Sequence, residues 1–166
     1  MLKKVAVAAV AAMFGVGVAS AADYTVKPKV TSLKTTPKTV LLVGNSFMYY
    51  NCGVNGTLSG IVKAKGGKLA STMATIGGAG LDWHDVKSYL RPNGLRSYST
   101  LKDGSNKLVF HQYKDGKVFD AVVLQDNSQG PVHPELSKFF KKYAKIHSAD
   151  IRATGAEPLF MMTWAY

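Results

Sequence analysis

Short apolar runs alternate along this chain with segments whose apolar residues recur at helical spacing. The clearest runs are 39–43 and 120–125, and their β-branched composition is typical of strands buried on both faces. Two more strands are expected over 68–76 and 159–164. The intervening helices are expected over 55–65, 81–90 and 134–155. This order predicts an α/β fold built on a parallel sheet.

Polar or glycine residues follow every predicted strand. Ser46 follows the first strand on a Gly-Asn-Ser turn, and segments 77–80, 125–128 and 164–166 follow the others. Because parallel strands end at one edge, where open α/β enzymes place their chemistry, these segments are expected to converge. Ser46 is therefore a candidate nucleophile. The alternative is that its hydroxyl caps the helix that follows.

A serine nucleophile needs donors that stabilise a developing oxyanion. The backbone N–H of Ser46 is one candidate, and that of Gly78 or Gly80 is a second, since glycine lets the backbone approach a ligand closely. The side-chain amide of Gln125 or Asn127 is the third.

The nucleophile also needs a base within hydrogen-bond reach. His84, after the glycine turn, and His133, after the third strand, are the histidines nearest the predicted edge, although an ordinary surface or loop position is the more common one for each. Neither metal-ligand spacing nor a phosphate-binding glycine loop occurs, so no metal and no cofactor is expected. Cys52 is the only cysteine, and we interpret it as a structural or partly exposed thiol.

The amino terminus has the pattern of an export signal. Lys3 and Lys4 precede an apolar, alanine-rich run, and Ala19, Ser20 and Ala21 supply a cleavage site. We therefore expect a signal peptide over 1–22 and a polar leader over 23–38. The mature chain is then a bacterial periplasmic or secreted protein without a membrane span.

The chain is basic, with 21 Lys and Arg against 10 Asp and Glu, for a net charge of +11. Its lysines are scattered, and no nucleic-acid motif accompanies them, so nucleic acid is not an expected partner. Attraction to an anionic cell-envelope surface fits this charge better.

Residues 92–119 differ in composition from the rest of the chain, because they are rich in Gly, Ser, Asn and Lys. We expect an insertion at the edge of the sheet, with a strand over 108–113 in a hairpin that ends at the Asp115-Gly116 turn.

Two blocks together resemble the SGNH (GDSL-like) hydrolase superfamily: Gly44-Asn45-Ser46-Phe47 after a strand, and the run from Asp120 to Gln129. The similarity is to bacterial exported members that begin Gly-Asn-Ser-Phe, and it covers roughly 40–166. It implies a flavodoxin-like, three-layer parallel sheet in a domain over 39–166. It also implies ester hydrolysis through an acyl-serine on Ser46, acting on a small-molecule or polysaccharide ester such as an acylated carbohydrate or cell-envelope ester.

The chain departs from that family in two places. Its third block reads Gln125-Asp126-Asn127-Ser128 instead of Gly-x-Asn-Asp, and it contains no Asp-x-x-His, the motif that carries the family's catalytic histidine. By the resemblance, a last strand and helix are missing. The alternatives to an esterase are a non-catalytic glycan- or envelope-binding protein with an SGNH-like cleft, and an inactive truncated product.

Overall fold

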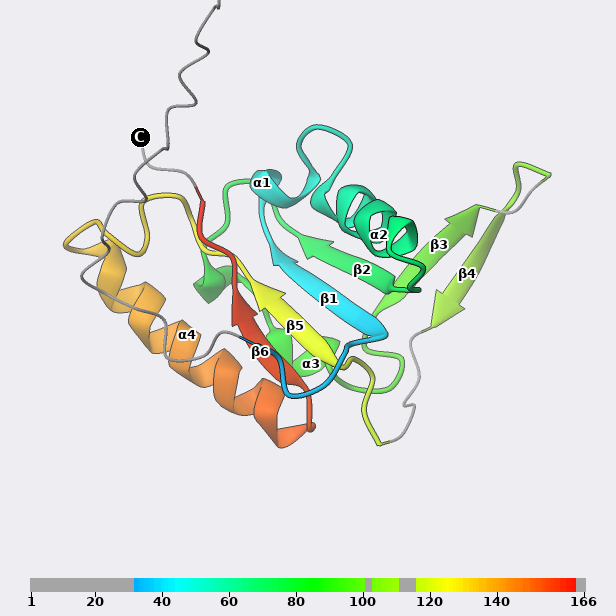
Figure 1. The fold of residues 1–166 in the computed structure, drawn as a ribbon. Helices are drawn as coiled ribbons and strands as arrows, with labels where there is room; N and C mark the ends of the chain where they lie inside the picture. The colour runs from blue at the N-terminus through cyan, green and yellow to red at the C-terminus, as the bar shows by residue number, and fades with distance from the viewer. Residues whose placement is uncertain (1–31, 101–102, 111–115, 164–166) are drawn as a thin grey trace, which may run out of the picture. The chain divides into compact units, whose positions relative to one another are not determined.

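Four parallel strands form the central sheet of the computed structural model, which describes residues 32–100, 103–110 and 116–163. Across the sheet they are β2 (Ala70–Thr75), β1 (Thr39–Gly44), β5 (Ala121–Leu124) and β6 (Glu157–Phe160) (Figure 1). This order, with the first strand inside the sheet, is that of flavodoxin-like α/β folds, as predicted. The predicted signal peptide and most of the leader lie outside the described residues.

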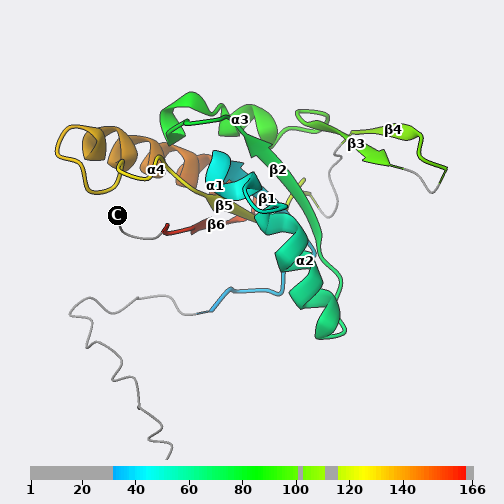
Figure 2. The ribbon, with the colours of Figure 1, turned by 90° about the horizontal axis from the view of Figure 1, so that it is seen from above.

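Helices cover both faces of the sheet and make three layers. α1 (Ser46–Tyr49) and α2 (Val54–Ala64) lie on one side, and α3 (Val86–Tyr89) and α4 (Leu136–Ala153) lie on the other (Figure 2). A 3₁₀ turn, η1 (Leu81–Trp83), precedes α3 and contacts α4. Residues from Leu33 onward form one compact unit.

The apolar run of β1 is buried on both faces because β1 lies inside the sheet and helices cover the sheet on both sides. Leu41 is in register with Thr72 of β2 and with Val122 of β5. Its side chain joins the core beneath α3 and α4, whereas Leu42 points to the face that carries α1 and α2. Alternate residues of one strand therefore contribute to two separate cores.

Residues 111–115, which include Asp115 of the predicted turn, lie outside the described residues. The described part of the segment 92–119 forms a hairpin. Its strands are β3 (Arg96–Thr100) and β4 (Asn106–Phe110), and they form a separate two-stranded sheet instead of extending the edge of the main sheet (Figure 1). The turn lies at Asp103-Gly104, where Gly104 has φ +82° and the Asp103 carboxylate accepts from Ser105 N. An Asp-Gly pair is typical of such a turn.

Two other predicted elements differ from the structure. The helix expected over 81–90 is divided into η1 and α3, because His84 is extended and Asp85 caps a new helix by accepting from Ser88 N at 3.2 Å. The strand expected over 159–164 begins earlier, at Glu157, and includes Pro158, while the segment 164–166 expected at its end lies outside the described residues. A proline is tolerated there because β6 lies at the edge of the sheet.

Candidate active site

The Gly-Asn-Ser turn joins the end of β1 to α1. Ser46 is the first residue of α1 and is exposed. The residue that caps α1 is Asn45, whose Oδ1 accepts from Phe47 N at 3.2 Å. The alternative that Ser46 serves as the cap is therefore wrong, and its hydroxyl is not used for this purpose.

The Asn45 side chain links three of the segments that follow the strands. It is only 2% exposed, and its Nδ2 donates to Ala79 O at 2.8 Å and to Asp126 O at 3.2 Å. With the bond from Phe47 N, both amide hydrogens and the oxygen have partners, as a buried amide requires. Asn45 thus fixes the turn beside Ser46 against the ends of β2 and β5.

Gln125 is also buried, and its amide is turned toward the backbone. Its Oε1 accepts from Asn45 N at 3.1 Å, and its Nε2 donates to Asp126 O. A Cβ at Gly44 would lie 2.5 Å from that Oε1, so glycine is needed there to admit the amide. Of the two candidate donors in this block, Gln125 is therefore the one whose buried amide stabilises the turn by hydrogen bonds to its backbone.

Asn127 is the candidate amide that lies at the surface of the edge. It is half-buried, its Oδ1 accepts from Gln129 N at 3.1 Å, and its Nδ2 donates to Gly78 O at 3.3 Å. Because this bond is long and exposed, a ligand oxygen can replace Gly78 O as the acceptor. Gly78 has φ +72°, which favours glycine. The structure thus brings Asn127 next to the glycine turn, as expected.

Asp126 is a site residue that the sequence analysis did not select. Its Oδ1 accepts from Leu81 N at 2.7 Å, and its backbone oxygen receives the bonds from Asn45 and Gln125. Burial raises the pKa of its carboxyl, hydrogen bonds from Leu81 and Asn127 oppose that rise, and the charge of Asp82 adds to it. The signal that would have identified Asp126 is a carboxylate directly after a buried strand.

His84 lies beneath the turn. Its ring is 4% exposed, Nε2 donates to Gly44 O at 3.0 Å, and Nδ1 lies 3.4 Å from the Tyr89 hydroxyl. Burial lowers the pKa of this imidazole. Because Nε2 carries the proton, the basic nitrogen is the one beside Tyr89. This geometry gives His84 a supporting role under the turn.

His133 is exposed on the loop after β5. Its Nδ1 accepts from Glu135 N at 3.2 Å and from Leu136 N at 3.4 Å, so in the neutral ring the proton resides on Nε2. The lone pair that a general base would use is therefore already engaged with the backbone. Neither candidate histidine presents a basic nitrogen to Ser46 in this arrangement.

Two cavities open at this edge and share the side chains of Asp126 and Asn127. The larger, of about 590 Å³, follows the loop after β5 and includes His133 and Met161 in its wall. The smaller, of about 230 Å³, lies between η1 and the start of α4; we call it the aromatic cavity, and its lining is Gly78, Gly80, Asp82, Trp83, Asp126, Asn127, Gly130, Leu136 and Phe139.

Among the described residues, no group of three or more His, Cys, Asp or Glu is placed to hold a metal ion. Within the same residues, no helix is both long and apolar enough to cross a membrane. Cys52 is an exposed free thiol in the turn before α2.

Comparisons with protein-family models, with curated proteins and with solved structures found no match for this chain. The resemblance to SGNH hydrolases accordingly stays a prediction drawn from the motifs, and any function must be argued from the geometry of the edge.

Proposed function

We propose that this chain is a serine ester hydrolase of the SGNH type, acting on an acylated carbohydrate or another cell-envelope ester. The observation that carries the proposal is the exposed Ser46 at the carboxyl end of the central strand β1. Asn45, buried beside it, holds the ends of β2 and β5 in place by hydrogen bonds. Strand-end segments that are fixed to one another by buried hydrogen bonds beside an exposed hydroxyl are compatible with a preorganised site.

In the proposed reaction Ser46 Oγ attacks the acyl carbonyl and its proton passes to a base. The C–O bond to the alcohol then breaks, the alcohol leaves with that proton, and water later releases the acid from the acyl-serine. The Ser46 N–H, a glycine N–H from Gly78 or Gly80, and the Asn127 amide are the proposed oxyanion donors. The removal of one such donor typically slows catalysis by about 10²- to 10³-fold.

A second candidate is a glycan-binding protein that does not cleave its ligand. It is favoured by one specific observation: the basic nitrogens of His84 and His133 are turned to Tyr89 and to the backbone N–H groups of Glu135 and Leu136. Without a base, a serine hydroxyl is a weak nucleophile.

Hydrolysis of p-nitrophenyl acetate by the wild-type protein and by Ser46→Ala tests the proposal. We expect the substitution to abolish turnover, and Asn127→Ala to reduce kcat by about 10²-fold or more. Gln125 and Asn45 are unsuitable controls because their loss would disturb the turn itself; Cys52→Ser, which changes an exposed thiol, should retain full activity. Equal activity in Ser46→Ala would remove Ser46 from the mechanism, and an inactive wild type would favour the binding protein.

A further inference from the structure

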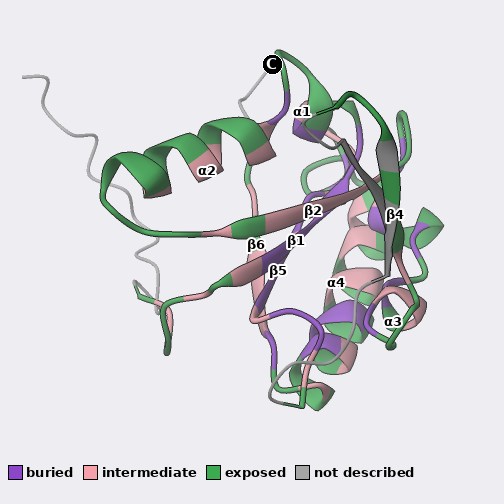
Figure 3. Ribbon diagram, turned by 90° about the vertical axis from the view of Figure 1, so that its right-hand side faces the viewer, coloured by how far each residue is buried: buried purple, intermediate pink, exposed green. Residues whose placement is uncertain are grey.

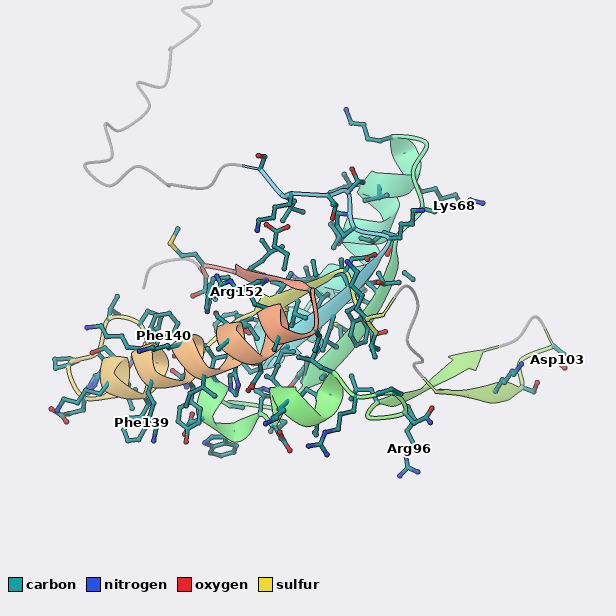
Figure 4. All side chains as sticks on the ribbon, turned by 90° about the horizontal axis from the view of Figure 1, so that it is seen from below. Lys68, Arg96, Asp103, Phe139, Phe140 and Arg152 are labelled. Carbon is teal, nitrogen blue, oxygen red and sulfur yellow. The ribbon has the colours of Figure 1, made fainter. Side chains whose placement is uncertain are left out.

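The aromatic cavity has two large exposed rings in its wall. Trp83, from η1, is 63% exposed, and Phe139, from α4, is 53% exposed. Phe139 and its neighbour Phe140 point to opposite sides of α4 (Figure 4). Phe140 packs against the core and meets Phe160 edge to face, whereas Phe139 lines the cavity. The exposure of Phe139 is therefore not explained by core packing.

Exposed aromatic rings grouped at one cavity indicate a binding surface, since water contact with large apolar surface is unfavourable. The cavity measures about 230 Å³, which is below the roughly 300 Å³ at which pockets for drug-sized molecules begin. Its size suits one ring-sized group of a larger ligand whose remainder lies outside.

Part of the lining of the aromatic cavity is polar and acidic. A Cβ at Gly80 would lie 2.7 Å from Asp82 Oδ1 and 3.0 Å from Asp126 Oδ1, so two carboxylates converge where glycine leaves space. Asn127 stands beside them and contributes an amide. In a chain of net charge +11, this local pair of acids opposes the overall charge and excludes an anionic ligand group.

We propose that the aromatic cavity binds one uncharged pyranose ring of a glycan, stacked on Trp83, with its hydroxyls donating to Asp82. A pyranose ring offers a face of C–H groups to the electron-rich face of an indole, and hydroxyl donors at its rim to carboxylates. Because the cavity shares Asp126 and Asn127 with the larger cavity, a glycan held there can extend into the larger cavity, although Ser46 lines neither of the two. The assignment of this ring to the substrate rests on the proposed function, but its binding does not.

Binding is measured by titration calorimetry on Ser46→Ala protein, so that turnover plays no part. The probes are trisaccharides of glucose, of xylose and of N-acetylglucosamine, with trigalacturonate as the anionic comparison. We expect at least one neutral trisaccharide to bind, and to bind more tightly than trigalacturonate. Adding Trp83→Ala should weaken binding about tenfold or more, as the loss of a central aromatic contact does. Trp83→Phe should retain part of the affinity.

A matched control is Phe160→Ala, which removes an exposed aromatic ring that lies in β6 and lines neither of the two edge cavities. It should leave the affinity unchanged. Failure of every neutral trisaccharide to bind, equal affinity in Trp83→Ala, or tighter binding of trigalacturonate would each overturn the proposal. If the ester activity of the wild type survives while sugar binding fails, only this inference falls; if sugar binds but Ser46→Ala still hydrolyses ester, only the proposed function falls.

Discussion

The two faces of the sheet are packed very differently. On the face beneath α3 and α4, buried side chains from β1, β5 and both helices form one continuous core. On the opposite face, the buried core consists of Val40, Leu42, Met48 and Ala121, and α2 is exposed or half-buried along its whole length (Figure 3). An apolar run that predicts a strand buried on both faces therefore does not predict equal packing on the two faces.

A groove lies on the face that carries α1 and α2. It has a volume of about 1050 Å³ and lies between α2 and the strands, with Val40, Leu58, Val62, Val123 and Leu159 among its lining residues. Leu58, Ile61 and Val62 are the residues whose helical spacing predicted this helix. Leu58 and Val62 line the groove and are half-buried, whereas Ile61 is exposed. The amphipathic pattern correctly located the helix, but the pattern carries no information on how closely a helix packs.

The largest difference in stability between the two faces is expected from replacing an isoleucine on each face. Ile151, in α4, is fully buried, and Ile61, in α2, is 58% exposed. Ile151→Ala should lower the free energy of unfolding by about 2–5 kcal/mol, because it leaves a cavity in a dense core. Ile61→Ala should change it by no more than about 0.5 kcal/mol.

Urea unfolding followed by circular dichroism measures both variants, and the midpoint should move only for Ile151→Ala if the slope is unchanged. The experiment is repeated at two protein concentrations. Equal losses in the two variants would contradict the comparison, and a loss in Ile61→Ala that grows with protein concentration would mean that self-association covers α2 in solution.

A smaller effect is expected at the amino end of the sheet, where Asp120 secures the chain that borders the groove. Its Oδ2 accepts from Lys38 N at 2.8 Å and from Thr39 N at 2.9 Å, and Lys117 lies 3.2 Å from its Oδ1. Burial alone would raise the pKa of this carboxyl, but the hydrogen bonds from Lys38, Thr39 and Lys117 outweigh it and lower the pKa to about 2.

Because the folded pKa of Asp120 lies below the ordinary value of 3.8, the carboxylate stabilises the fold above that pH and loses this contribution as the pH falls toward 2. After allowance for solvent screening, we expect about 1 kcal/mol. Asp120→Asn should abolish that acid-dependent part of the unfolding free energy, measured by urea unfolding from pH 5 to pH 2. Thr39→Val, which removes only the hydroxyl contacts, should abolish less of it; a wild-type acid profile in Asp120→Asn would refute the role.

Some features of this fold could be predicted from the sequence, and others could not. The strands β1 and β5 and the helix α4 were predictable because a long apolar run or a long amphipathic stripe indicates directly which residues are buried. The convergence of strand ends followed from their being parallel. The Asn45 and Asp126 network was not predictable, since its hydrogen bonds join residues 34 to 81 positions apart. The break at His84 likewise depends on a distant partner, the carbonyl of Gly44.

That histidine gives the smallest predicted effect, and it belongs to the densely packed face. Burial lowers the pKa of His84, the hydrogen bond to Gly44 O opposes this, and the nearby His147 and Asp82 act in opposite directions. Since the folded ring resists protonation, the unfolded chain takes up the proton first, and stability should fall as the pH drops below about 6.5. In His84→Gln, whose amide can still donate to Gly44 O, the decline in the urea midpoint between pH 7 and pH 5 should be shallower than in the wild type. An unchanged slope in His84→Gln would show that the acid sensitivity of the face beneath α3 and α4 does not originate beneath the Gly-Asn-Ser turn.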